Sequence, residues 1–298
     1  MVGLQASGKS YYAKELAKQY NAKVFSSDEY RERLLGDETD QTNNSKIFSQ
    51  LERDIINHLL SGESAIFDAC NISSKRRRNF LNRVNKTGCE KICVIVLRKL
   101  EKCIEANNNR ERKVPDYSII KYYKSFQLPY LEEGWDTIKL IYTDKDDNSV
   151  SVDEFNFKYN DYEQNSKYHS KTLGTHLWST AAYIRDNYKE DVDFNELYEA
   201  AKLHDIGKPF CRTDKDRKGN IDGNTHYYGH ENVGAYDSLF IDYSKDVDNL
   251  LIAFLINNHM RPLNWAKSEE AKEKDKLRWG ERKFNLVCKL NKADKESH

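Results

Sequence analysis

The sequence predicts two domains, an α/β domain with a parallel sheet followed by an all-α helical bundle. Up to about residue 146, short apolar runs that fit strands alternate with helical periods, the pattern of a parallel sheet with helices on both faces. The second domain is expected over residues 164–298, where the periods are helical from Lys171 onward and strand-like runs largely disappear. Residues 147–163 are polar and are expected to form a linker, although residues 150–157 could make a short strand.

Composition limits the class of protein. The 298 residues include 48 basic and 48 acidic side chains, so any nucleic-acid binding must come from local patches rather than a global positive field. No apolar run approaches the ~18 residues of a membrane span. No signal peptide is visible and the six cysteines form no CxxC pair, so a cytoplasmic protein with reduced thiols is expected. Nothing in the sequence determines the oligomeric state.

The stretch Gly3–Ser10 reads GLQASGKS and fits the phosphate-binding pattern G-x-x-x-x-G-K-[ST]. In this pattern the glycines let backbone N–H groups curl around a phosphate. Lys9 would reach the β- and γ-phosphates of ATP, and the Ser10 hydroxyl would hold Mg²⁺. A helix expected over residues 9–19 would add its positive N-terminal end. The residues expected to bind ATP are Gly3, Ala6, Ser7, Gly8, Lys9 and Ser10.

Only Met1 and Val2 precede this loop, whereas such a loop normally follows a buried strand. The recorded chain is therefore expected to be shorter than the natural one, with the first strand truncated. Apolar runs predict further strands over residues 22–25, 64–68, 92–97 and 138–143.

The stretch after the first of these strands, Ser26-Ser27-Asp28-Glu29-Tyr30-Arg31, resembles the polynucleotide kinase family of P-loop enzymes, and the resemblance covers residues 1–144. It implies that Asp28 takes the proton of the acceptor hydroxyl and that Arg31 grips the acceptor's own phosphate. The structural alternative is a helix N-terminus with a serine cap and favourable acidic residues, and both interpretations can hold together.

The family also has an aspartate like Asp68, which ends a predicted strand where it can orient Mg²⁺ or its water shell. The basic run Lys75–Arg78 follows, and such a run is more often a solvated face than a binding site, so its role is open.

A lid loop is expected over residues 107–115. In the kinase family an arginine on such a lid contacts the ATP phosphates. Arg110 matches it best, with Arg112 as the alternate, although this chain has Ala106 where the family usually has another arginine.

In the second half, a His-Asp pair stands among three further histidines and one aspartate, each in or next to a helical stretch. Imidazole and carboxylate together suit a divalent transition metal, and side chains from separate helices build such sites in bundles. The set is rich in nitrogen, so Mn, Fe, Ni, Co or Zn is expected rather than calcium. The expected metal ligands are His176, His204, Asp205, His230, His259 and Asp294. Core or surface roles are expected for His58, His169 and His226, with a place in the lining of the metal pocket as the alternative for His169.

The order H, HD, H, H, D resembles the HD superfamily of metal-dependent phosphohydrolases, from about Asn165 to the C-terminus. The resemblance implies two ligand sets that share Asp205: His176, His204, Asp205 and Asp294 for one ion, and Asp205, His230 and His259 for the other. Many HD proteins keep only the first set, so one or two ions are expected and the extra histidines favour two. Lys208 could neutralise a substrate phosphate, or could be a solvated lysine at a helix end.

Together the halves resemble bifunctional nucleic-acid end-healing enzymes. The resemblance implies an ATP-dependent kinase for a polynucleotide 5′-OH and a phosphoesterase that removes a 2′,3′-cyclic phosphate or a terminal phosphomonoester, which prepares both ends for a ligase. Two alternatives stay open: a small-molecule or nucleoside kinase fused to an HD nucleotide phosphohydrolase, and a nucleotide-gated HD hydrolase without kinase activity. Asp28 favours a kinase over the gated hydrolase, because a nucleotide sensor needs no base for an acceptor hydroxyl. Arg31 favours an acceptor that carries a phosphate. RNA or DNA and the metal identity stay open.

Overall fold

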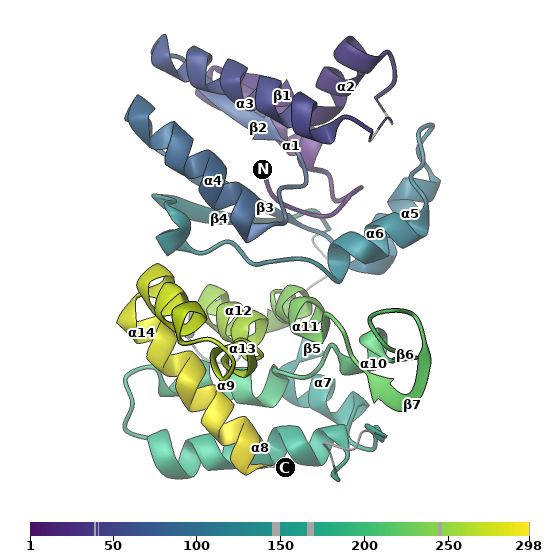
Figure 1. Cartoon of the computed structure of the whole chain (residues 1–298), viewed down its shortest axis with the longest axis vertical. Helices are drawn as coiled ribbons and strands as arrows, with labels where there is room; N and C mark the ends of the chain where they lie inside the picture. The colour runs from purple at the N-terminus through teal and green to yellow at the C-terminus, as the bar shows by residue number, and fades with distance from the viewer. Residues whose placement is uncertain (39, 41, 145–149, 166–169, 244–245, 298) are drawn as a thin grey trace. The chain divides into compact units, whose positions relative to one another are not determined.

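The computed structural model describes residues 1–38, 40, 42–144, 150–165, 170–243 and 246–297. The chain divides into two compact units, unit 1 with Met1–Tyr122 and Pro129–Lys145, and unit 2 with Tyr123–Leu128 and Asp146–His298. Unit 1 is α/β with parallel strands and unit 2 is mainly helical, which confirms the predicted fold class (Figure 1). The stretch expected to be a linker counts with unit 2 from residue 146 onward.

The strands of unit 1 form two parallel pairs. β1 (Ala22–Ser26) pairs with β2 (Ser64–Asp68), and β3 (Ile92–Leu97) pairs with β4 (Thr137–Tyr142). The β3 sequence ICVIVL is apolar throughout and buried over its last five residues, as expected for a parallel strand covered on both faces.

The N-terminal segment joins the two pairs. The Val2 N–H donates to the Val94 carbonyl at 2.8 Å, and the Val2 carbonyl accepts from the Val96 N–H at 2.8 Å. On the other side, the Met1 amino group donates to the Phe67 carbonyl at 2.9 Å, and burial lowers the pKa of this amino group. Val2 therefore takes the central position between β2 and β3, and the phosphate loop starts from the middle of the sheet.

The helices of unit 1 are α1 (Lys9–Tyr20), α2 (Ser27–Leu35), α3 (Asn44–Leu60), α4 (Ser74–Val84), α5 (Leu100–Asn108) and α6 (Asp116–Tyr123). In α3, Ile47, Leu51 and Ile55 recur every four residues and form one apolar stripe. This stripe packs with Phe25 of β1 and Tyr30 of α2 in a buried cluster, which holds α2 and α3 against one end of the sheet.

Unit 2 consists of α7 (Val152–Lys158), α8 (Leu173–Tyr188), α9 (Phe194–Leu203), α10 (Lys208–Cys211), α11 (His230–Ser238), α12 (Asn249–Asn258), α13 (Pro262–Trp265) and α14 (Glu269–Glu296). Residues 251–256 of α12 are all buried, so this apolar helix lies in the core of the unit. The long α14 is interrupted at Gly280, where the backbone leaves the helical region. No helix in the described part of the chain is both long and apolar enough to cross a bilayer.

Short strands supplement these helices. β5 (Val150–Ser151) pairs in parallel with β8 (Ile241–Asp242), and β6 (Thr213–Lys215) forms an antiparallel hairpin with β7 (Ile221–His226). The hairpin lies in a stretch rich in Lys, Asp and Gly, a composition more typical of loops than of strands. Its turn is closed by Asp216, whose carboxylate accepts the backbone N–H groups of residues 218 and 220.

The six-residue segment Tyr123–Leu128, called the arm below, packs as part of unit 2. The rings of Phe126 and Tyr236 lie 5.0 Å apart, and the Leu128 N–H donates to Asn257 Oδ1 at 3.0 Å. Because Tyr236 belongs to α11 and Asn257 to α12, the arm contacts two neighbouring helices of the bundle.

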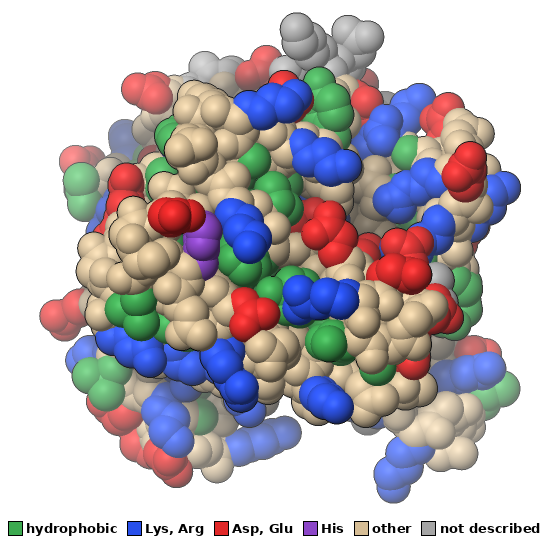
Figure 2. All heavy atoms as spheres, turned by 90° about the horizontal axis from the view of Figure 1, so that it is seen from above, with side chains coloured by type: hydrophobic (Ala, Val, Ile, Leu, Met, Phe, Trp, Pro, Cys, Tyr) green, Lys and Arg blue, Asp and Glu red, His purple; other side chains and the backbone are tan. Residues whose placement is uncertain are grey.

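The two signs of charge are interspersed on the face shown in Figure 2, where Lys and Arg side chains alternate with Asp and Glu. This agrees with equal numbers of basic and acidic residues in the chain.

Candidate functional sites

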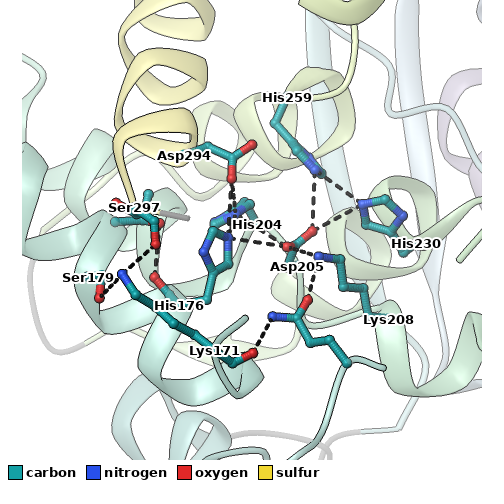
Figure 3. Close-up of polar contacts among 12 residues, drawn as sticks. Lys171, His176, Ser179, His204, Asp205, Lys208, His230, His259, Asp294 and Ser297 are labelled. Atoms are coloured by element: carbon teal, nitrogen blue, oxygen red, sulfur yellow. Dashed lines mark hydrogen bonds and ion pairs between the residues drawn. The ribbon is translucent and has the colours of Figure 1, made fainter. Parts of the chain in front are cut away.

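Six side chains point toward one another in unit 2 (Figure 3). They are His176 from α8, His204 and Asp205 after α9, His230 at the start of α11, His259 at the end of α12 and Asp294 from the last turn of α14. These are the six residues expected from the sequence to bind metal. The first five are buried and Asp294 is partly exposed, so the cluster lies inside the bundle.

The six residues form two groups, within each of which the potential ligand atoms lie within 4.8 Å of one another: His176, His204 and Asp294, and Asp205, His230 and His259. Asp205 lies between them. Its Oδ2 is 3.5 Å from both His176 Nε2 and His204 Nε2. Its Oδ1 is 3.1 Å from His230 Nε2 and 3.5 Å from His259 Nε2. The two oxygens of one carboxylate therefore face different groups, as a bridging ligand requires.

The ring orientations suit metal binding. Nδ1 of His204, His230 and His259 each lies 2.7–2.9 Å from a backbone carbonyl oxygen three residues earlier. A carbonyl can only accept, so Nδ1 carries the proton and Nε2 presents a lone pair. His230 Nε2 and His259 Nε2 lie 3.2 Å apart, where two lone pairs repel unless a proton or a cation lies between them. This donor set fits a metal ion.

The backbone around the cluster favours a cation. His204 and His259 are the C-terminal cap residues of α9 and α12, and helix C-termini carry partial negative charge. Gly207 lets the turn after α9 approach α11 closely, because a Cβ atom there would overlap the His230 carbonyl oxygen. The glycine in the sequence HDIG thus brings Asp205 within reach of His230.

Without metal, the cluster has shifted protonation equilibria. Burial opposes charge on His176, but hydrogen bonds with Asp205 and Asp294 outweigh it and raise the pKa of His176 to about 9. Burial lowers the pKa of His204. Burial would raise the pKa of Asp294, yet its hydrogen bonds with His176 and His204 hold this pKa below its usual value. Burial likewise opposes ionisation of Asp205, and the neighbouring charges of Lys208 and His204 keep its pKa well below the ordinary value. Both carboxylates are therefore ionised and able to bind a cation.

Lys208 is not a solvated lysine. Its side chain is 5% exposed, and the ammonium lies 2.5 Å from Asp205 Oδ2. It also donates to Gln164 Oε1 at 2.7 Å. A fixed positive charge therefore stands directly beside the bridging carboxylate (Figure 3).

In unit 1, the phosphate loop is shaped by close backbone packing. A Cβ atom at Gly3 would come within 2.5 Å of the Val96 carbonyl oxygen, so only glycine fits beside β3. The Lys9 ammonium is buried and donates to the Leu4 carbonyl of the loop. Among the described residues, no side chain caps the first turn of α1, which leaves its N–H groups available to an anion. The loop residues present fit a bound phosphate.

Residues 1–129 match the AAA domain family, and residues 173–297 match the HD domain family. The chain joins a P-loop kinase-like domain to an HD domain. Both domains indicate catalysis, so the protein is an enzyme, and the HD domain implies a divalent metal. No curated protein matches the chain at a significant level.

Two residues that sequence reasoning missed hold the phosphate loop of the kinase-like domain. The Thr143 hydroxyl donates to the Ser7 carbonyl at 2.7 Å. Arg98 donates to the Ala6 carbonyl at 3.3 Å and pairs with Asp144 at 2.9 Å. Thr143 and Arg98 directly follow β4 and β3, and a position at the carboxyl end of a parallel strand was the only signal that could have indicated them.

Asp28 lies between two arginines in the kinase-like domain. Its Oδ1 is 2.6 Å from Arg31 Nη1 and its Oδ2 is 3.0 Å from Arg112 Nη1. The Ser26 hydroxyl also accepts the Asp28 N–H at 3.3 Å, so Asp28 belongs to the capped first turn of α2 as well. Of the two arginines expected on a lid, the structure directs Arg112 to Asp28, whereas the Arg110 side chain is exposed.

Asp68 is buried at the end of β2. Burial raises the pKa of Cys70, and the charges of Lys9, Asp28 and Asp68 each act on this thiol. Lys9, Asp28 and Asp68 therefore lie close enough to Cys70 for their charges to affect its thiol. Ser10 lies exposed in the first turn of α1.

One residue of the basic run Lys75–Arg78, Arg77, has a structural role. The side chains of Arg77 and Glu133 are 2% and 0% exposed and form a paired contact at 2.7 and 2.8 Å. Arg77 also donates to the Asn71 carbonyl at 2.9 Å. Arg77 therefore ties α4 to the loop after β2 rather than forming a solvated face.

The histidines expected to have core or surface roles lie apart from the two metal groups where the structure describes them. His58 Nε2 is 3.2 Å from the Ser64 carbonyl oxygen, and His226 Nε2 is 3.0 Å from Asp222 Oδ1. His169 lies outside the described residues.

Proposed function

We propose that this enzyme heals nucleic-acid ends. The kinase-like domain would transfer the γ-phosphate of ATP to a polynucleotide 5′-OH, and the HD domain would remove a 2′,3′-cyclic phosphate or a terminal phosphomonoester. The observation that carries the proposal is Asp28, a half-exposed carboxylate held between two guanidinium groups. One carboxylate serves an acceptor hydroxyl, and two arginines beside it suit an acceptor that carries its own phosphate.

In the proposed kinase reaction, Lys9 and the N-terminus of α1 bind the ATP phosphates, and Asp68 orients Mg²⁺. The acceptor oxygen forms a bond to the γ-phosphorus while the bond from that phosphorus to the β–γ bridging oxygen breaks and ADP leaves. Asp28 takes the hydroxyl proton. Arg31 and Arg112 hold the phosphate of the acceptor, and the exposed Arg110 remains a candidate contact to ATP.

In the proposed hydrolysis, His176, His204 and Asp294 would hold one first-row transition ion, His230 and His259 would hold a second, and Asp205 would contribute to both groups. When bound, such ions activate a water and stabilise negative charge on a phosphate ester. Lys208 adds a positive charge beside Asp205. The products, a 5′-phosphate and a 3′ end without phosphate, are the ends that a ligase joins, so a ligase is the expected partner.

The test is to follow labelled phosphate from ATP. Wild-type protein is incubated with labelled ATP and RNA or DNA oligonucleotides with 5′-OH ends, against a panel of free nucleosides. Label on oligonucleotides is expected, and Lys9→Ala and Asp28→Ala should abolish it while leaving HD hydrolysis intact. Label on nucleosides alone would replace the proposal with a small-molecule kinase. Hydrolysis that depends on ATP, with no label transferred, would instead indicate a nucleotide-gated hydrolase.

A second experiment tests the phosphoesterase with oligonucleotides that end in a 2′,3′-cyclic phosphate or a 3′-phosphate. Wild-type and Lys9→Ala proteins are expected to remove these groups, and Asp205→Ala is not. If neither end is processed while free nucleotides are hydrolysed, the HD domain acts on small molecules.

A further inference from the structure

We infer that Gln164 is a positioning residue of the HD domain, which holds the Lys208 ammonium where it meets a phosphate oxygen of the substrate. The inference rests on the proposed phosphoesterase function. Gln164 precedes residues 173–297, the part of the chain that matches the HD domain family, so it is a feature of this chain outside that match.

The Gln164 side-chain amide is buried, and both its oxygen and its nitrogen make a hydrogen bond. The residue is 1% exposed. Its Oε1 accepts from Lys208 Nζ at 2.7 Å, and its Nε2 donates to the Lys171 carbonyl at 3.1 Å. An ammonium only donates and a carbonyl only accepts, so the amide has a single orientation that satisfies both neighbours. Gln164 therefore offers Lys208 a fixed acceptor.

Two further contacts fix Gln164 itself. The Tyr227 hydroxyl donates to the Gln164 backbone carbonyl, and the Tyr227 carbonyl accepts from His230 Nδ1 at 2.7 Å. Lys171 Nζ donates to the Ser297 carbonyl at 2.7 Å, next to the end of α14 that carries Asp294 (Figure 3). The segment with Gln164 is thus tied to both metal groups, and the Lys208 ammonium lies 5.7 Å from the centre of the Tyr227 ring.

The physical need for Gln164 follows from charge. Asp205 neutralises Lys208 in the buried site, but Asp205 Oδ2 also faces His176 and His204. A cation bound there would share this oxygen and repel the ammonium. A neutral acceptor that does not bind the cation keeps the ammonium in place, so that a phosphate dianion arrives at a charge whose position is already set. Loss of Gln164 should therefore weaken phosphate binding without removing the ions.

The test uses the full chain loaded with Mn²⁺ and the variant Gln164→Met, which keeps side-chain length but loses both hydrogen bonds. The control is Glu163→Gln, an exposed neighbour. Binding of inorganic phosphate is measured by calorimetry, and KM and kcat with p-nitrophenyl phosphate. Gln164→Met is expected to weaken phosphate binding and raise KM about tenfold, the size of a hydrogen bond to a charged group. The ion content, kcat and ATP-dependent transfer should stay near wild type.

A double-mutant cycle with Lys208→Met separates positioning from support of the fold. If Gln164 acts through Lys208, the double variant matches Lys208→Met alone. Additive losses, wild-type phosphate binding in Gln164→Met, or loss of metal from that variant would each overturn the inference.

If circular dichroism shows that Gln164→Met misfolds, the variant Tyr227→Phe replaces it. This variant removes one hydroxyl from the same network and should weaken phosphate binding about threefold. Unchanged phosphate binding in Tyr227→Phe would overturn the inference. A wild-type protein that binds phosphate but hydrolyses no ester would refute the proposed function and leave the binding test of Gln164 valid.

Discussion

Asp205 connects the two metal groups within a single residue. Its Oδ2 faces His176 and His204, and its Oδ1 faces His230 and His259. The other ligands each belong to one group. Substitutions at these positions should therefore differ in how many ions they remove.

Asp205→Ala is expected to lose both ions and to reduce hydrolysis to background, whereas His230→Ala and His259→Ala should each lose mainly one. These two histidine variants should retain some phosphomonoesterase activity, and none of the three should change ATP-dependent transfer. Metal content of the purified proteins by mass spectrometry is the measurement. A wild-type content near one ion per chain, unchanged in both histidine variants, would show a mononuclear site with His230 and His259 as pocket walls.

The metal-free protein should lose stability as pH rises from about 6.5 to about 9. His176 has a pKa raised from 6.5 to about 9, because its hydrogen bonds with Asp205 and Asp294 outweigh burial. A group whose pKa is higher in the folded than in the unfolded protein stabilises the fold. This contribution is complete when the pH is below the pKa of the unfolded state, and it is lost as the pH rises through the pKa of the folded state. The raised pKa of His259 acts in the same direction, and His204, with its lowered pKa, is neutral in both states above pH 6.5.

Thermal melting of chelator-treated protein between pH 6.5 and 9 is the measurement. The metal-loaded protein is the control. It should not show this decline, because a bound metal takes the place of the proton on these imidazoles. A metal-free melting temperature that is constant or rises across this window would contradict the assigned protonation of His176.

At the scale of elements, the loop after α5 that is expected to act as a lid is held together at its two ends and presents Arg112. The Asn107 side chain donates to the Val114 carbonyl at 2.8 Å and accepts the Val114 N–H at 3.0 Å. This double contact fixes the ends of the loop after α5. Arg112 is then directed to Asp28, while Arg110 is exposed.

Arg112→Ala is expected to reduce phosphate transfer to an oligonucleotide about tenfold or more, mainly through a higher KM for the acceptor, because a charged hydrogen bond is lost. Arg110→Ala is the matched variant on the same loop. It should leave the acceptor KM unchanged and raise only the KM for ATP. Initial rates with each substrate varied in turn give both constants. The assignment of Arg112 to the acceptor fails if Arg110→Ala raises the acceptor KM more than Arg112→Ala does.

At the scale of the whole molecule, the two units are not simply consecutive. The chain enters unit 2 for the arm Tyr123–Leu128, returns to unit 1 and leaves it again after residue 145. The arm contributes Phe126, buried against Tyr236, and its Lys124 carbonyl accepts from Asn232 of α11 at 2.8 Å. The helices α11 and α12 that it contacts carry or precede His230 and His259.

Phe126→Ala in the full chain is therefore expected to destabilise unit 2 by about 3–5 kcal/mol, the usual loss for a fully buried phenylalanine. The displaced arm should also loosen α11 and α12 and weaken binding of the ion held by His230 and His259. Denaturant unfolding and metal titration measure the two effects. Tyr117→Ala, which truncates an exposed aromatic residue, is the control. Unfolding of Phe126→Ala at the same denaturant concentration as this control would show that the arm contributes little to unit 2.

The sequence by itself determined the fold class, the strands β1 to β4 and the chemistry expected of the sites, but not the hairpin of β6 and β7. An apolar run such as ICVIVL predicts a buried strand from a few consecutive residues. The phosphate loop and the His-Asp pair are likewise patterns of neighbouring residues. Only the tertiary structure decided which lid arginine lies at Asp28, that Arg77 is a buried partner of Glu133, and that Gln164 holds Lys208. These contacts join residues 84, 56 and 44 positions apart. Periodicity in a short window records which face of an element is buried, but it carries no information about which distant side chain lies opposite, because that depends on how the elements pack.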